Sequence, residues 1–120
     1  MESIAIISVT VHGAGLGQKL RHHFEADSNY EVHCFEKEGR ASGDTAEFFS
    51  SMKPHMETWS KSYDKLLFIM ATGIVVRMIA PYIKHKSEDP AVVVMDEQGH
   101  FAISLLSGHL GGANEWTADI

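Results

Sequence analysis

The side chains best suited to chemistry lie near the end of the chain, in the run Ser107-Gly108-His109-Leu110-Gly111-Gly112-Ala113-Asn114-Glu115. His109 titrates near neutrality and can act as a general base toward water, with Glu115 orienting it or serving as the base itself. Asn114 and backbone N–H groups can stabilise an oxyanion. The run therefore predicts a hydrolytic site whose substrate contacts come from Ser107, Gly108, Gly111, Gly112 and Asn114. The alternative is a capped helix start with a polar first turn.

A nucleophilic serine is not expected in that run, because no G-x-S-x-G elbow surrounds Ser107. A second candidate site follows the apolar run at 65–71, where Thr72 and Gly73 precede a helical segment that carries Arg77. Thr72 is predicted to cap that helix. Because helix N-termini favour anions, Thr72, Gly73 and Arg77 are predicted to bind an anionic part of a substrate. The alternative is that Arg77 simply extends from an apolar helix into solvent.

A third glycine-rich run, His12-Gly13-Ala14-Gly15-Leu16-Gly17, is expected to form a turn between a strand and a helix. It departs from the dinucleotide fingerprint G-x-G-x-x-G, because Gln18 stands where the third glycine belongs. Glu36 does follow at about the distance of the acidic residue in that motif, but acidic residues are common. A tight turn that lets the next helix pack on a sheet explains the glycines better.

The elements that would position these runs alternate between strand and helix. Apolar, β-branched runs predict buried strands at 3–11, 30–35, 65–71 and 91–95. Turn residues at 96–99 predict a hairpin, with a returning strand at 101–105. Helical spacing predicts helices at 15–26, after Asp44 with a break at Pro54, from Ile74 to about Pro81, and after residue 112. This order predicts one α/β domain over residues 1–120, with a three-layer, doubly wound, mostly parallel sheet and helices on both faces, like the Rossmann and flavodoxin folds.

Composition narrows the class of protein further. The net charge is −6 and no basic stripe is visible, which argues against a nucleic-acid partner. No apolar stretch approaches the roughly 20 residues that span a bilayer, and no signal-peptide pattern opens the chain. Cys34 is the single cysteine and is expected to be buried in a strand, so a cytoplasmic location is predicted. The histidines show no paired metal-ligand spacing, so no metal site is predicted.

Three ordered motifs resemble the CbiG family of cobalamin biosynthesis. They are Phe68-Ile69-Met70-Ala71-Thr72-Gly73-Ile74-Val75-Val76-Arg77, then Asp89-Pro90-Ala91-Val92-Val93-Val94-Met95-Asp96-Glu97-Gln98-Gly99, then Ile103-Ser104-Leu105-Leu106-Ser107-Gly108-His109-Leu110-Gly111-Gly112-Ala113-Asn114-Glu115. The first sixty residues resemble the family only loosely. Family members usually continue into a central segment and a C-terminal domain, so this chain is expected to be the N-terminal domain of a longer protein, with that C-terminal domain as a partner.

The resemblance implies cobalt-precorrin-5A hydrolase activity, in which the ring-A δ-lactone of a cobalt corrinoid is opened and acetaldehyde is released. The cobalt would belong to the substrate, so no cofactor of the protein itself is expected. One alternative is a non-catalytic corrinoid-binding domain whose chemistry resides in the C-terminal part. Another, from fold analogy alone, is a nucleotide- or flavin-binding domain. The oligomeric state stays open, with a homo-oligomer among the options.

Overall fold

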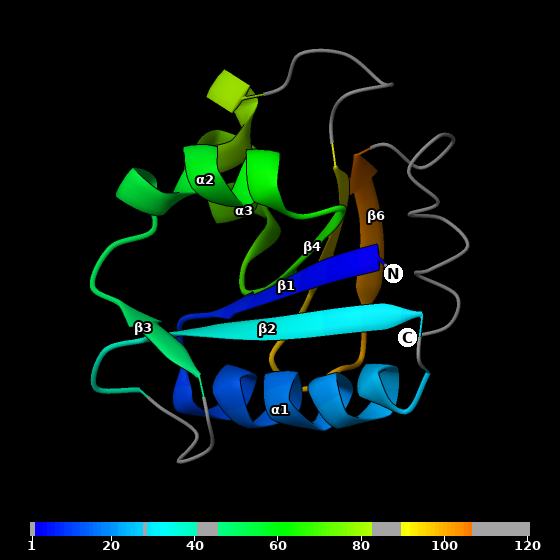
Figure 1. Ribbon diagram of the computed structural model, residues 1–120. Coiled ribbons are helices and arrows are strands. Elements are labelled where there is room, and N and C mark those ends of the chain that lie inside the picture. Colours follow the sequence, from blue (N-terminus) through cyan, green and yellow to red (C-terminus); the bar gives the residue numbers. More distant parts are fainter. Residues whose placement is uncertain (1, 28, 41–45, 83–89, 107–120) are drawn as a thin grey trace.

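The described strands form one six-stranded sheet in the order β3-β2-β1-β4-β5-β6 (Figure 1). A computed structural model describes residues 2–27, 29–40, 46–82 and 90–106. Neighbouring strands are parallel except for the last pair, and their bounds are β1 (Glu2–Ser8), β2 (Tyr30–Lys37), β3 (Glu47–Phe49), β4 (Lys65–Ile69), β5 (Ala91–Met95) and the antiparallel β6 (Ala102–Leu106). The predicted doubly wound, mostly parallel α/β sheet is confirmed.

Helices cover both faces of this sheet, which gives three layers (Figure 1). One face carries α1 (Val11–Glu25), and the other carries α2 (Met56–Ser62) and α3 (Thr72–Ile79). Two short 3-10 helices, η1 (Lys53–His55) and η2 (Ala80–Tyr82), accompany α2 and α3. None of the helices in the described ranges is long and apolar enough to cross a membrane.

The sheet has a separate hydrophobic core on each face, because successive strand residues point to opposite sides. In β1, Ile4 and Ile6 pack with the α1 core, whereas Ala5 and Ile7 pack with the α2 and α3 core, and all four are almost fully buried. Strands β4 and β5 are buried on both faces in the same way. This two-sided burial explains the uninterrupted apolar runs in the sequence.

The glycine-rich run at 12–17 lies inside α1, so its prediction as a turn is wrong. The helix begins at Val11, and its N-cap residue is Thr10, whose Oγ1 accepts a 2.9 Å hydrogen bond from the Gly13 N–H. Glycine has a poor helix propensity, but packing against the sheet overrides it here. A Cβ at Gly17 would lie 3.1 Å from Cγ2 of Ile6, so the missing side chain lets α1 approach β1 closely.

The predicted helix after Asp44 is also wrong in its first part. Asp44 lies outside the described residues, and Glu47–Phe49 form β3, which pairs with the end of β2. Strand pairing with β2 overrides the local capping pattern there. Pro54 then lies in the first turn of η1, a position where its missing N–H costs nothing. Helical structure in the second part of the predicted segment is confirmed, because η1 begins at Lys53 and α2 follows it directly; Pro54 begins this helical stretch and does not break it.

The hairpin predicted at 96–99 is confirmed between β5 and β6. Gly99 has a φ of 76°, a left-handed conformation that favours glycine. The Asp96 carboxylate accepts hydrogen bonds from the backbone N–H groups of Phe101 and Gln98, at 2.7 and 3.3 Å. These bonds lower the pKa of Asp96 below its ordinary value. The predicted turn at 107–112 and the helix after it lie outside the described residues.

Candidate functional site

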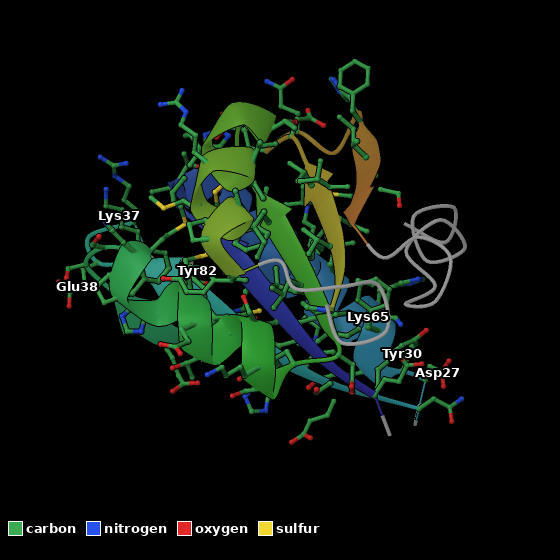
Figure 2. The ribbon with its side chains drawn as sticks, turned by 90° about the horizontal axis from the view of Figure 1, so that it is seen from above. Asp27, Tyr30, Lys37, Glu38, Lys65 and Tyr82 are labelled. Atoms are coloured by element: carbon green, nitrogen blue, oxygen red, sulfur yellow. The ribbon has the colours of Figure 1, made fainter. Side chains whose placement is uncertain are left out.

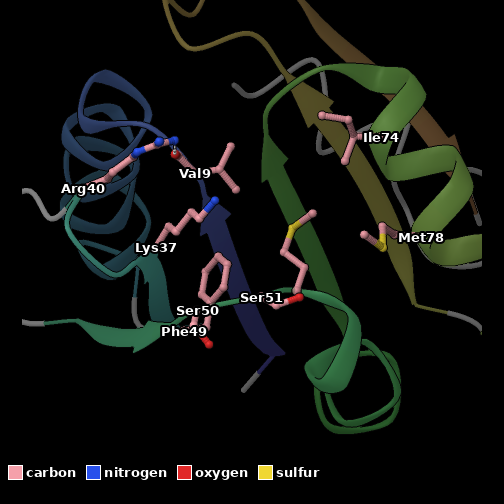
Figure 3. A pocket seen from close by; sticks show the side chains of 9 residues that line it. Val9, Lys37, Arg40, Phe49, Ser50, Ser51, Ile74 and Met78 are labelled. Atoms are coloured by element: carbon pink, nitrogen blue, oxygen red, sulfur yellow. Dashed lines mark hydrogen bonds between the residues drawn. The ribbon is translucent and has the colours of Figure 1, made fainter.

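A cavity of about 290 Å³ opens at the carboxyl ends of β1 and β2, on the face that carries α3 (Figure 3). In doubly wound sheets, ligands bind beyond the carboxyl ends of the strands where the strand order reverses, and this chain reverses between β1 and β4. The lining residues come from distant parts of the sequence and are Val9, Lys37, Arg40, Phe49, Ser50, Ser51, Met52, Ile74 and Met78. The cavity therefore occupies the place where this fold class binds ligands.

A β-turn directly after β2 supplies both cations of the cavity. Lys37 is its first residue and Arg40 its fourth, and the Arg40 N–H donates to the Lys37 carbonyl at 3.0 Å. Gly39, the third residue, has a φ of 79°, as a type II turn requires. The turn brings its first and fourth residues together, so the two positive charges share one wall of the cavity.

Arg40 is held against the end of β1. Its Nη1 donates to the Val9 carbonyl at 3.1 Å, a bond drawn in Figure 3. In the described part of the chain, neither Lys37 nor Arg40 forms an ion pair with a carboxylate. Lys65, at the opposite end of the sheet in Figure 2, is by contrast buried and ion-paired with Glu2. Lys65, at the amino end of the sheet, is thus neutralised by Glu2, whereas Lys37 and Arg40, at the carboxyl end, line the cavity.

The opposite wall of the cavity is apolar. Figure 3 shows Ile74 and Met78 on α3 across from Lys37 and Arg40. Residues four apart on a helix share one face, which explains why these two line the cavity together. Phe49 closes the floor, where its ring packs edge-to-face on Trp59 at a centroid distance of 5.5 Å. Such a combination of apolar and cationic walls suits a ligand with an apolar part and anionic groups.

The other face of the sheet is closed at the corresponding position. Glu36 is 1% exposed and accepts a 3.0 Å hydrogen bond from Nε2 of Gln18 on α1. The acidic residue expected in a dinucleotide site is therefore packed under the helix, in agreement with the mismatch in the glycine spacing. Burial raises the pKa of the neighbouring Cys34 thiol to about 12, so Cys34 is a structural residue, as predicted.

The second predicted site, at Thr72, Gly73 and Arg77, lies entirely within the described residues. Ala71 is the N-cap of α3 and makes no side-chain capping bond, so the prediction that Thr72 caps the helix is wrong: Thr72 is the first residue of α3. Gly73 is exposed, and a Cβ there would meet no atom within 4 Å. Arg77 is exposed in the last turn of α3 and does not line the cavity. The binding roles of Thr72, Gly73 and Arg77 stay predictions.

The candidate catalytic run, with His109 and Glu115, lies outside the described residues, as do Ser107, Gly108, Gly111, Gly112 and Asn114. Within the described residues, no three His, Cys, Asp or Glu side chains are placed to share a metal ion. Sequence reasoning did not identify Lys37 and Arg40 as candidate binding residues. One signal for Lys37 was available: strand alternation from the buried Cys34 and Glu36 places Lys37 on the other face.

Comparison with known proteins agrees with this architecture. Residues 54–120, more than half of the chain, match the family described as cobalamin synthesis G N-terminal. The chain belongs to this family. Proteins named cobalt-precorrin-5A hydrolase from Priestia megaterium and Salmonella typhimurium are each 40% identical to it over 116 residues, which is 97% of this chain and 31% of each relative. The resemblance seen in three motifs is therefore confirmed, and it extends through the first sixty residues as well.

Solved structures show the same relationship. A crystal structure of a cobalamin biosynthesis protein G homolog from Sulfolobus solfataricus matches with a TM-score of 0.76 and 28% identity, over 98% of this chain and 32% of that one. A homoserine dehydrogenase from S. aureus matches with a TM-score of 0.51 at 12% identity, which shows a likeness of fold alone. The family member described here spans about a third of the length of the curated relatives that it matches.

Proposed function

We propose that this chain is the N-terminal domain of a cobalt-precorrin-5A hydrolase, and that it opens the ring-A δ-lactone of a cobalt corrinoid with release of acetaldehyde. The observation that supports this most directly is the cavity at the carboxyl edge of the sheet, where two cations face an apolar wall. A corrinoid intermediate combines an apolar macrocycle with acetate and propionate arms. Its chemistry complements both walls, and the two 40%-identical relatives carry the name of this activity.

The chemistry requires an activated water and a site for the developing oxyanion. Water adds to the lactone carbonyl and the ring C–O bond breaks, which leaves a carboxylate and a hydroxyl group. Acetaldehyde leaves when the C–C bond between the hydroxyl-bearing carbon and the macrocycle breaks, with loss of the hydroxyl proton and protonation of the macrocycle. His109 is proposed to take the proton from water, with Glu115 as its orienting partner or as the base. Asn114 and the backbone N–H groups of the glycine-rich run are proposed to stabilise the oxyanion. The cobalt enters with the substrate, and no cofactor of the protein is invoked.

A direct test combines binding and turnover on one preparation. A cobalt corrinoid δ-lactone is added to the 120-residue chain, its binding is followed through its visible absorption, and acetaldehyde is assayed. Binding with acetaldehyde release would support a complete hydrolytic site in this chain. Binding without release would support the alternative, a corrinoid-binding domain whose catalytic groups lie in the C-terminal domain of the longer protein. Absence of binding would contradict both.

The role of His109 has its own test. His109→Ala is expected to slow lactone opening by about 100- to 10,000-fold, the usual contribution of a general base. His100→Ala is the matched control, because His100 is exposed on the β5–β6 hairpin and does not line the cavity. Lactone opening at the unchanged rate in His109→Ala would remove His109 as the base and leave Glu115 as the candidate.

A further inference from the structure

We infer that Lys37 and Arg40 form a carboxylate clamp that holds one acetate or propionate arm of the corrinoid, while the edge of the macrocycle packs against Ile74 and Met78. This inference rests on the proposed function and deepens it. It assigns the recognition of the anionic arm to the turn after β2 and not to Arg77, which lies outside the lining of the cavity.

The turn itself preorganises the clamp. Lys37 ends β2 on the face of the cavity, and the left-handed Gly39 returns the chain so that Arg40 lies beside it. One N–H of the Arg40 guanidinium is used on the Val9 carbonyl, which fixes the orientation of the group. A guanidinium has further N–H donors in a planar fork that matches a carboxylate, and the Lys37 ammonium adds a point charge. The clamp is therefore built before any ligand arrives.

Charge makes this spot selective for an anion. The chain carries a net charge of −6, yet no carboxylate in the described ranges pairs with Lys37 or Arg40. The neighbouring Glu36 points to the opposite face, where Gln18 holds it under α1. Lys37 is half-buried and Arg40 is exposed, and both lie beside apolar residues of the cavity. A cation beside a low-dielectric wall attracts an anion more strongly than the same cation surrounded by water. A carboxylate arm would supply the missing partner.

The size of the cavity limits what it can hold. At about 290 Å³ it lies at the lower end of the roughly 300–1,000 Å³ range of small-molecule pockets. This volume accommodates one arm and the adjoining ring edge, not a complete macrocycle. Phe49 and Met78 offer apolar surface for that ring edge, and the exposed Ser50 and Ser51 also line the cavity. The rest of the corrinoid must extend beyond this cavity.

The test uses two corrinoids that share a macrocycle and differ in their arms. Dicyanocobyrinic acid carries carboxylates, and dicyanocobinamide carries amides in their place. Lys37→Ala and Arg40→Ala are each expected to weaken binding of the acid by about 10- to 100-fold, the usual worth of a charge-assisted hydrogen bond, and to leave binding of the amide within about twofold. Lys19→Ala, an exposed lysine on α1, is the matched control and is expected to change neither.

Two further variants separate the clamp from a structural role. Arg40→Lys keeps the charge but loses the fork, so it is expected to recover part of the acid binding. Gly39→Ala strains the turn without removing a cation, and it is expected to weaken binding of the acid selectively. Thermal unfolding of each variant shows whether it is folded.

The outcomes distinguish the clamp from the proposed function. If the unaltered chain binds the acid and both alanine variants bind it equally well, the clamp is overturned while the proposed function stands. Equal loss of acid and amide binding in the variants would also overturn the clamp, because it would indicate a general change of shape. If the unaltered chain binds neither corrinoid, the proposed function fails, and the clamp fails with it.

Discussion

The two faces of the sheet differ at the end where ligands would bind. On the α1 face, Gly13 and Gly17 let the helix lie close to the strands, and Glu36 is buried under Gln18. On the α3 face, the corresponding space is a cavity lined by Lys37 and apolar side chains. Glu36 and Lys37 are neighbours in sequence, yet strand alternation sends one into a closed core and the other into the cavity. A glycine-rich run close to a sheet edge is therefore no sign of a ligand site until its packing is known.

The helix starts repeat this contrast. Thr10 caps α1 with its side chain, and its hydroxyl also donates to the Glu97 carboxylate at 2.7 Å, so that end is closed by the protein itself. Ala71 leaves α3 without a side-chain cap, and a Cβ at Gly73, in the first turn, would meet no atom within 4 Å. A side-chain cap satisfies an N–H group at a helix start and stabilises the helix, whereas uncapped N–H groups stay available for an anionic ligand. Four experiments can break or sharpen this comparison.

The largest effect is expected at Cys34, in the core under α1. Burial raises the pKa of its thiol from its ordinary 9.0 to about 12, so at pH 8 the native protein should react with iodoacetamide about a thousandfold more slowly than the unfolded chain. A cysteine placed in the cavity as Ser51→Cys should react nearly as fast as an unfolded thiol. Rates of alkylation, assigned by peptide mapping, measure both. Comparable rates for the two cysteines would show that the α1 face is not closed.

The same raised pKa predicts how Cys34 affects stability at high pH. The unfolded chain ionises first, so the free energy of unfolding should be unaffected by this thiol below pH 9 and should fall as the pH rises from about 9 to about 12. Chemical denaturation over that range follows the effect. Cys34→Ala should remove this part of the alkaline destabilisation.

The second effect concerns the close approach of α1. Gly17→Val is expected to lower the free energy of unfolding by about 1–3 kcal/mol, because its side chain would overlap Ile6 and Ile69. Gly15→Val is the matched control in the same helix, since a Cβ there would meet no atom within 4 Å. Urea denaturation of both variants gives the difference. Similar stabilities would mean that the glycines do not set the distance between α1 and the sheet.

The smallest effects concern the two helix starts and should have opposite signs. Thr10→Ala removes the capping bond of α1 and is expected to cost about 1 kcal/mol, whereas Thr10→Ser should retain most of it. Ala71→Ser adds a capping oxygen to α3 and is expected to stabilise the protein by up to about 1 kcal/mol. Shifts of the melting temperature report both. A destabilising Ala71→Ser would contradict the view that the start of α3 has an unused capping position.

Local patterns in the sequence determined a large part of this protein. The apolar runs placed β1, β4 and β5, the Asp96–Gly99 chemistry placed the hairpin, and three motifs indicated the family. These features depend on residues within about ten positions of one another, where hydrophobic periodicity and turn preferences act. Burial of Cys34 followed from the same alternation along β2.

Only the tertiary structure decided the start of α1, the existence of β3 and the site at Lys37 and Arg40. Gly13 and Gly17 fit in α1 because Ile6 and Ile69 leave little room for a side chain at these two positions, and those contacts join residues far apart in sequence. β3 forms because β2 offers it a pairing edge, and the cavity exists because β1, β2, β3 and α3 meet at one end of the sheet. Packing between distant segments outweighs local propensity there, so no single stretch of sequence carries the signal.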